Sequence, residues 1–280
     1  MRHDKRRNQG LSYTDGGQPR AKRSLGQNFL QDANIARKIV NCLEIEPGDH
    51  VLEIGPGPGA LTRFIVEYLP ARLILVEKDG HWAAERMAAG AGQLHVILAD
   101  ALTMAWEYFG PSWRFIGNLP YNVASPFMWD IFSRSGGISR AVFMVQKEVA
   151  LRVIAGPGCS AYGALSIWLQ SFIKPKLEFI VPPQVFYPRP KVDSAVLSFS
   201  PLEGGSAGRL KDGGARDRLN RTLKACFQMR RKQLGTIAKS IGCDCEILDK
   251  AGIAPVRRPE ELTPEQFRTL AELGFFAGKH

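Results

Sequence analysis

Short apolar segments alternate with amphipathic ones along residues 50–146, and this alternation restricts the possible fold more than any other feature. Apolar runs too short for helices suit strands buried on both faces, whereas apolar residues three or four apart suit helices. The expected strands are 50–54, 73–77, 95–99, 114–117 and 141–146, with helices expected at 60–69, 81–89 and 124–133. Such βαβ units predict a doubly wound, mostly parallel sheet with helices on both faces.

The two ends of the chain differ from this central region. Two further β-rich runs, 176–181 and 194–200, are joined by the proline-rich segment 182–190 and fit an antiparallel pair on the same sheet. Before the first strand, Asp32 suits the N-cap of a helix over 32–43. We therefore expect a basic mobile tail (1–23), an α/β domain (24–200), a Gly/Ser-rich linker (201–214) and a small all-helical domain (215–280).

Positive charge is excessive and unevenly placed. The formal net charge is +10, and segments 1–23 and 216–232 each contain seven Lys or Arg residues. Two clusters of this density favour a polyanionic partner, and nucleic acid in particular. In the second cluster, the basic side chains expected to face RNA are Arg218, Arg221, Lys224, Arg230, Arg231 and Lys232.

Composition also indicates a compartment. No apolar run approaches the roughly 18 residues that a membrane span needs, and the N-terminal residues have no apolar core typical of a signal peptide. The five cysteines are scattered and odd in number, which does not suit a disulfide framework, and no histidine lies near the Cys243–Cys245 pair. We expect a cytoplasmic protein with no membrane contact and no metal.

A glycine-rich turn follows the first expected strand and reads Glu53-Ile54-Gly55-Pro56-Gly57-Pro58-Gly59-Ala60. Ligands of open parallel sheets bind beyond the carboxyl ends of the strands, where Glu77 suits ribose hydroxyls and Asp100 suits a second polar contact. The turn also satisfies a relaxed dinucleotide pattern, or it could be purely structural. Pro56 and Pro58 lack the N–H groups that would bind a pyrophosphate, and an acid at Glu53 suits a cationic ligand. A sulfonium methyl donor is therefore favoured.

The fourth expected strand ends in Gly117-Asn118-Leu119-Pro120-Tyr121, which suits chemistry on an adenine amine. That amine is a poor nucleophile because its lone pair is delocalised into the ring. The Asn118 side-chain carbonyl and the Leu119 backbone carbonyl, made rigid by Pro120, can accept both amine hydrogens and free the lone pair. Tyr121 offers a face for base stacking. Asn-x-Pro also makes ordinary turns, but its place beside the glycine-rich turn favours catalysis by positioning and electrostatics.

Taken together, these motifs resemble those of a known family, the ribosomal RNA adenine dimethyltransferases, and most closely those of its bacterial small-subunit branch. The resemblance covers residues 24–280. Its motifs, in the family's order, are Gly26-Gln27-Asn28-Phe29-Leu30, Glu53-Ile54-Gly55-Pro56-Gly57, Glu77-x-Asp79, Asp100-Ala101, Gly117 to Tyr121, Gln146-Lys147-Glu148-Val149, Tyr162-Gly163-x-Leu165-Ser166, Val181-Pro182-Pro183-x-x-Phe186, Pro190 to Val196 and Phe227-x-x-Arg230-Arg231-Lys232.

The resemblance implies a Rossmann-like class I methyltransferase fold with a seven-stranded sheet and S-adenosylmethionine as donor. It implies N6,N6-dimethylation of two adjacent adenines in a 3′-terminal hairpin loop of 16S rRNA, within an assembling 30S subunit. The implied donor-site residues are Asn28, Leu30, Gly55, Glu77, Asp100 and Asn118, and the implied catalytic residues are Asn118, Leu119, Pro120, Tyr121 and Phe186. Phe186 fits either a core position or a second stacking face for a base held outside its stack, and the second is favoured.

Two other functions remain open. The related macrolide-resistance enzymes modify large-subunit rRNA, but the Tyr162-Gly163 and Phe227-x-x-Arg230-Arg231 patterns argue against that substrate. A non-catalytic assembly factor of the same fold should show damage at Asn118–Tyr121 or at Glu77, and neither is altered. Nothing in the sequence suggests an oligomer, so we expect a monomer.

Overall fold

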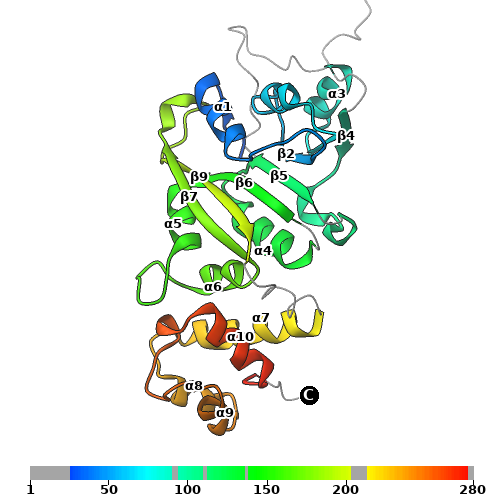
Figure 1. Cartoon of the computed structure of the whole chain (residues 1–280). Helices are drawn as coiled ribbons and strands as arrows, with labels where there is room; N and C mark the ends of the chain where they lie inside the picture. Colours follow the sequence, from blue (N-terminus) through cyan, green and yellow to red (C-terminus); the bar gives the residue numbers. More distant parts are fainter. Residues whose placement is uncertain (1–25, 90–93, 110–111, 136–137, 203–212, 277–280) are drawn as a thin grey trace, which may run out of the picture.

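A seven-stranded sheet forms the centre of the computed structural model, which describes residues 26–89, 94–109, 112–135, 138–202 and 213–276 (Figure 1). The strand order is β4-β3-β2-β5-β6-β9-β7, with all pairs from β4 to β6 parallel and both pairs of β9 antiparallel. Its strands are β2 (His50–Ile54), β3 (Arg72–Glu77), β4 (Leu94–Leu98), β5 (Trp113–Asn118), β6 (Ile138–Gln146), β7 (Ile173–Val181) and β9 (Ser194–Pro201). The expected mostly parallel sheet with an antiparallel pair is confirmed.

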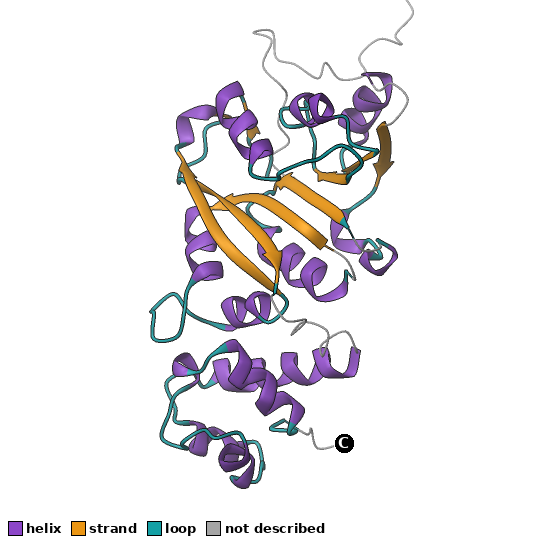
Figure 2. Ribbon diagram, viewed as in Figure 1, coloured by secondary structure: helices purple, strands orange, loops and turns teal. Residues whose placement is uncertain are grey.

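Helices cover both faces of this sheet (Figure 2). Val51 packs on one face with residues of α1 (Ala33–Asn41) and α2 (Thr62–Ile65), and Leu52 packs on the other with α4 (Ala124–Arg134), α5 (Lys147–Ile154) and α6 (Ala164–Gln170). The helix α3 (Gly80–Ala89) lies against β3 and β4. Successive residues of a strand point to opposite faces, so a strand buried on both faces must be apolar along its length.

Local details both match and depart from the sequence-based expectations. Asp32 caps α1, because its carboxylate accepts hydrogen bonds from the backbone N–H groups of Asn34 and Ile35 at 2.8 and 3.0 Å. The helix expected over 60–69 is shorter: α2 passes into a 3-10 turn at Val66–Tyr68, which ends at Leu69 in the left-handed region (φ 50°). Sequence patterns also missed a second, two-stranded antiparallel sheet of β1 (Phe29–Leu30) and β8 (Phe186–Tyr187).

The residues after the expected linker form a helical unit of α7 (Gly213–Gln228), α8 (Leu234–Ser240), α9 (Glu246–Lys250) and α10 (Pro264–Glu272). Its apolar residues join the same core as α4 and α6, with Leu219 and Phe267 buried alongside Trp168. This unit lies below the sheet in Figure 1, beside α6. The domain boundaries remain predictions, and the tail and most of the linker lie outside the described residues.

Polar contacts tie the helical unit to the turn between α5 and α6, and we call this set of contacts the clasp. The Gly158 N–H donates to the Glu260 carbonyl at 2.8 Å, and the Tyr162 hydroxyl donates to the Leu262 carbonyl at 2.8 Å. Arg230 forms an ion pair with Glu260 at 2.7 Å and also donates to the Ser160 carbonyl at 3.0 Å. The helical unit is thus held by directional bonds as well as by a shared core.

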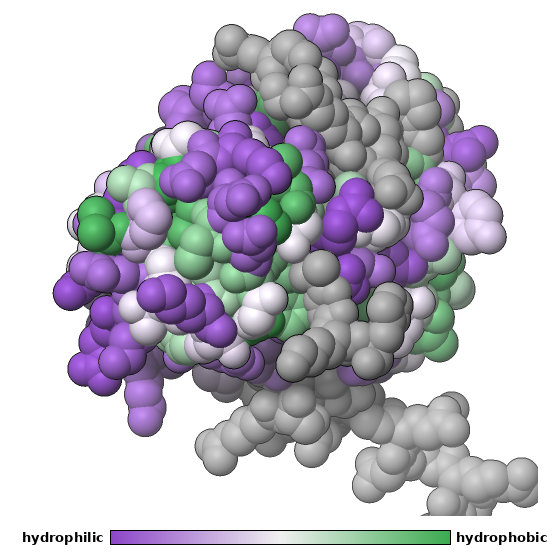
Figure 3. Space-filling model, turned by 90° about the horizontal axis from the view of Figure 1, so that it is seen from below, coloured by the Kyte–Doolittle hydropathy of each residue, from purple (hydrophilic) through white to green (hydrophobic). Residues whose placement is uncertain are grey.

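The surface of the helical unit is mixed in character. Seen from below, hydrophilic side chains border a smaller group of hydrophobic ones (Figure 3). Among the described helices, none combines the length and the apolar character needed to cross a membrane.

Candidate active site

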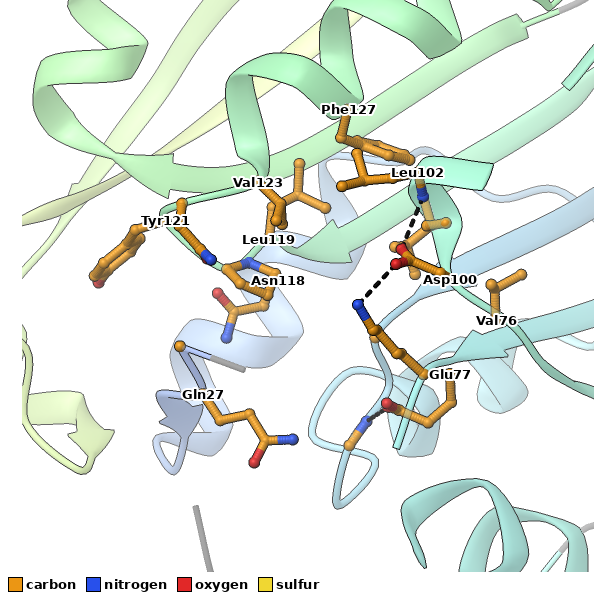
Figure 4. A pocket seen from close by; sticks show the side chains of 18 of the residues that line it. Gln27, Val76, Glu77, Asp100, Leu102, Asn118, Leu119, Tyr121, Val123 and Phe127 are labelled. Carbon is orange, nitrogen blue, oxygen red and sulfur yellow. Dashed lines mark hydrogen bonds and ion pairs between the residues drawn. The ribbon is translucent and has the colours of Figure 1, made fainter. Parts of the chain in front are cut away.

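A cleft opens at the carboxyl ends of the central strands, where the sequence places the glycine-rich turn and the Asn118 motif (Figure 4). Its empty space, including the open mouth, is about 1030 Å³, which suits a ligand the size of a nucleoside cofactor. Eight of the expected site residues line it: Asn28, Gly55, Glu77, Asp100, Asn118, Leu119, Pro120 and Tyr121. Leu30 of β1 and Phe186 of β8 do not, because both side chains are buried in the core.

The glycine-rich turn has no N–H group left for a pyrophosphate among residues 55–59. The Gly55 N–H donates to the Val76 carbonyl at 2.9 Å, the Gly57 N–H to the Glu77 carboxylate at 3.0 Å and the Gly59 N–H to the Pro56 carbonyl at 2.9 Å. The two prolines of the turn have none to offer. The dinucleotide alternative needs such donors, so the structure disfavours it.

Glu77 is held rigidly at the end of β3. Besides the Gly57 bond, its second carboxylate oxygen accepts from the Asp79 N–H at 2.8 Å. Burial raises the pKa of this carboxyl group, although backbone hydrogen bonds from Asp79, Gly57 and Lys78 act in the opposite direction. A carboxylate oxygen can accept two hydrogen bonds, so each oxygen retains capacity for a ligand hydroxyl. This arrangement suits the two hydroxyls of a ribose.

Asp100 follows β4, the strand beside β3, and has a partner that sequence reasoning missed. The Lys78 ammonium group forms an ion pair with its carboxylate at 2.7 Å, and the Leu102 N–H donates to the other oxygen at 3.0 Å. The hydrogen bond from Lys78 is the main reason that the pKa of Asp100 is lowered. Asp100 is therefore an ionised acceptor beside the apolar side chains of Leu102 and Phe127, which also line the cleft. Such a setting suits the amine edge of an adenine.

Residues 26–30, which we call the strap, cross the cleft near the Asn118 motif. The Phe29 ring packs edge-on against Trp82 with centroids 5.4 Å apart. It also lies against Gly57, whose φ is 50°, and a Cβ atom there would stand 3.1 Å from the ring. Glycine at position 57 therefore permits both the turn and the close approach of the strap. The last two residues of the strap form β1, which pairs Leu30 with Phe186.

The strap determines how the Asn118 amide is oriented. The Asn118 Nδ2 group donates to the Asn28 backbone carbonyl at 3.0 Å, which leaves the side-chain oxygen free of any bond within the described part of the chain. Within that same part, the Leu119 carbonyl also accepts no hydrogen bond, while its N–H donates to the Met144 carbonyl at 3.0 Å. Two neighbouring residues therefore each offer an available acceptor oxygen. An amine has two hydrogens that such a pair could accept.

Tyr121 lies on the other side of Asn118 from Glu77 and Asp100 (Figure 4). Its hydroxyl forms a 2.9 Å hydrogen bond with Ser194 Oγ, and burial raises its pKa, so the ring remains a neutral phenol. Asn118 thus lies between Glu77 and Asp100, on what we call the donor side, and Tyr121, on what we call the acceptor side. An in-line transfer between two molecules needs one reactant on each side.

The expectation that the Glu53 carboxylate faces the ligand is wrong. The side chain is 1% exposed, points away from the cleft and accepts a 2.6 Å hydrogen bond from the Thr62 hydroxyl. Burial raises its pKa to about 7 despite that bond and the nearby Arg86. Glu53 therefore supports the packing of α2 behind the glycine-rich turn. Among the described residues, no group of three or more His, Cys, Asp or Glu side chains could hold a metal ion.

The chain is similar to known proteins over most of its length. A family model described as "Ribosomal RNA adenine dimethylase" matches residues 18–274. A relative from Nitratidesulfovibrio vulgaris (strain Hildenborough), named ribosomal RNA small subunit methyltransferase A, is 55% identical over 261 residues and covers 91% of this chain and 96% of its own. A relative of the same name from Lawsonia intracellularis is 45% identical over 262 residues, covering 90% and 93%.

Two solved structures are similar over most of the chain. A dimethyladenosine transferase from Plasmodium falciparum has a TM-score of 0.74 and 26% identity, covering 86% of this chain and 95% of its own. The 23S rRNA methyltransferase ErmE has a TM-score of 0.65 and 25% identity, covering 88% and 98%. Because coverage is this wide in both, the likeness includes the helical unit as well as the sheet.

Proposed function

Because this chain belongs to the ribosomal RNA adenine dimethylase family, we propose that it transfers two methyl groups from S-adenosylmethionine to the exocyclic amine of adenines in small-subunit rRNA. The observation that carries the proposal is the orientation of Asn118. The strap fixes its amide through the bond from Nδ2 to the Asn28 carbonyl, which leaves the side-chain oxygen as an available acceptor between the donor side and the acceptor side.

The residues of the donor side fit this ligand. Glu77 can accept hydrogen bonds from both ribose hydroxyls, and Asp100 can accept one from the adenine amine. Leu102 and Phe127 supply apolar contacts for the adenine ring, and the strap with Asn28 covers the cleft. Leu30 supports the strap from the core, and its direct contact with the donor remains a prediction. When bound, S-adenosylmethionine supplies a methyl group on a positively charged sulfur.

The chain's own residues then prepare the target amine. The Asn118 and Leu119 oxygens accept its two hydrogens, and Pro120 limits the freedom of the backbone between the motif and α4. The amine nitrogen becomes pyramidal, and its lone pair points across Asn118 toward the donor side. Methylation leaves a cationic, acidic nitrogen that releases a proton to water, so no strong base is required. Most of the acceleration comes from positioning and fixed dipoles.

The acceptor side holds the base. We propose that the adenine leaves its stack and lies on the Tyr121 ring, which is typically worth about 1–3 kcal/mol per base. Phe186 was expected as the second stacking face. In this structure it is 4% exposed and paired with Leu30, so stacking would require it to move out of the core. Its role in holding the base remains a prediction.

The helical unit supplies the second point of contact with RNA. Arg221 and Lys224 are exposed on α7, and Arg231 and Lys232 are exposed just after it. Such cations would bind phosphates, which position an RNA without reading its sequence. Arg230 differs from them because it forms the clasp ion pair with Glu260. We propose that the substrate is rRNA within a pre-30S particle, and that the protein acts in the cytoplasm as a monomer.

The two alternatives are less well supported. The relatives with 45–55% identity are named as small-subunit enzymes, whereas the large-subunit enzyme ErmE is 25% identical. A non-catalytic factor of the same fold would have no need of an oriented Asn118 or a rigid Glu77, and both are present. A role in assembly alongside catalysis remains compatible with this site.

The test is methyl transfer from labelled donor to small subunits taken from a strain that lacks this modification, followed by nucleoside analysis. We expect N6,N6-dimethyladenosine, abolished by Asn118→Ala and retained by Asn41→Ala on the outer side of α1. Transfer only to large-subunit RNA would support the macrolide-resistance activity instead. Binding to subunits without any transfer would support a non-catalytic factor.

A further inference from the structure

Tyr121 is the only aromatic side chain of the Asn118 motif, and its one described polar partner comes from a strand far away in the sequence. The hydroxyl lies 2.9 Å from Ser194 Oγ, across 73 positions of the chain. A stacking surface contributes to a rate only if its ring stays where the base must lie. What holds the ring therefore bears on the reaction.

Ser194 is well suited to hold it. The residue is fully buried at the start of β9 and is bonded on both sides, pairing with Gln146 of β6 and Val181 of β7. β6 also pairs with β5, where Asn118 lies opposite Met144, two residues before Gln146. Ser194 and Asn118 are therefore fixed at the same edge of one sheet.

The turn before Ser194 is fixed as well. The Lys147 N–H donates to the Asp193 carbonyl at 3.0 Å, and the Lys147 ammonium group pairs with the Asp193 carboxylate at 3.1 Å. Ser194 thus belongs to a rigid frame, whereas the Tyr121 ring is only partly buried and projects from a loop. A hydrogen bond between them transfers the rigidity of the frame to the ring.

We propose that Ser194 is a positioning residue that fixes the Tyr121 ring as the stacking surface for the target adenine. This inference rests on the proposed function, because it assigns Ser194 to the acceptor side of the same site. Ser194 lies outside the cleft that would hold the donor. Its removal should therefore slow transfer without weakening donor binding.

The expected size follows from the bond itself. A neutral hydrogen bond contributes about fivefold, or roughly 1 kcal/mol, when its loss lets the ring leave the productive position. Tyr121→Phe removes the same bond from the other partner and keeps the stacking face. It should cost the same about fivefold, and the double variant Ser194→Ala/Tyr121→Phe should cost no more than either single variant. Tyr121→Ala should cost more, because stacking itself is lost.

The experiment compares single-turnover transfer rates of these variants on unmodified small subunits, with S-adenosylhomocysteine affinity measured in parallel. Ser198→Ala is the matched control, since Ser198 is also a buried serine of β9 but bonds to Glu178 at 2.5 Å. The inference is supported if the two single variants and the double variant share one rate at unchanged ligand affinity. It is overturned if the losses multiply in the double variant, or if Ser194→Ala matches the wild-type rate.

If Ser194→Ala does not fold, Tyr121→Phe still removes the bond without touching β9, and a wild-type rate in that variant overturns the inference. If the wild-type chain transfers no methyl group, the proposed function fails. A hairpin RNA with 2-aminopurine at the target position then reports stacking directly. Equal loss of quenching in the three variants supports the role of Ser194, and unchanged quenching refutes it.

Discussion

Replacing Asn118 by aspartate separates the two roles that the structure gives this side chain. The substitution keeps the shape of the side chain and both acceptor positions, but it removes the N–H group that bonds the Asn28 carbonyl at 3.0 Å. An ionised carboxylate would place an oxygen against that carbonyl, and two acceptors repel. The strap should then lose its anchor beside the catalytic motif.

The magnitude follows from this one contact. Leaving the Asn28 carbonyl without its donor costs about 1–3 kcal/mol. The strap lines the donor cleft, so a bound ligand requires it to close against this unfavourable contact. The same cost therefore weakens ligand binding by roughly 5- to 150-fold. Protonation reverses the effect, since a carboxyl O–H can donate to the carbonyl again. A carboxyl group facing a carbonyl has a raised pKa, so affinity should recover as the pH falls.

The assay is calorimetric titration of Asn118→Asp with S-adenosylhomocysteine between pH 5 and pH 8. This ligand has a neutral sulfur, so attraction between a carboxylate and a sulfonium cannot mask the loss. Asn41→Asp on α1 adds the same charge far from the cleft and retains its bond from the Tyr68 hydroxyl. An affinity of Asn118→Asp equal to that of this control at every pH would refute the assignment of the strap contact.

Further predictions concern stability. Glu53→Gln should abolish one pH dependence of the free energy of unfolding. Because burial raises the pKa of Glu53 from 4.5 to about 7, this carboxyl group stabilises the fold fully only when the pH is below 4.5. That contribution is lost as the pH rises to about 7. In urea denaturation, the free energy of unfolding of the variant should therefore rise by about 3 kcal/mol relative to that of the wild type over this range. A constant difference would contradict the burial of the charge. Gly57→Ala should lower the free energy of unfolding by about 1–2 kcal/mol, because φ is 50° and Phe29 lies 3.1 Å from the new methyl group; equal denaturation midpoints would rule this strain out. Arg230→Ala should cost about 1 kcal/mol or less, since the pair with Glu260 is partly exposed, and should leave the salt dependence of RNA binding unchanged. A reduced salt slope would return Arg230 to the RNA-binding face.

Much of the fold follows from local patterns. The strands of the sheet are predictable because burial on both faces requires unbroken apolar runs, and the Asp32 cap is predictable from its side chain alone. The β1–β8 pair is not, since strands of two residues carry no periodicity and their pairing joins Leu30 to Phe186 across most of the chain. The same pairing explains why Phe186 lies in the core.

The site was predictable where motifs follow strands, and less so where contacts cross between them. Period-two alternation would have placed Glu53 correctly, because it points to the same face as Val51, away from the cleft. The Lys78 contact with Asp100 could have been inferred from the alignment of two adjacent parallel strands, which sets Glu77 opposite Leu98. The Tyr121–Ser194 bond has no such signal, because it depends on where a loop meets an antiparallel strand.

The clasp has a consequence for how an RNA could be chosen. Because the clasp and the shared core hold the helical unit against the sheet, the structure sets the separation between the exposed cations of α7 and Asn118. An RNA engages both places at once only if its phosphates and its adenine loop already stand at that separation. A flexible strand would lose conformational freedom to match it, whereas a folded subunit has lost that freedom beforehand. The protein would then select its substrate by the distance between these phosphates and the target loop, while the pocket recognises a single base.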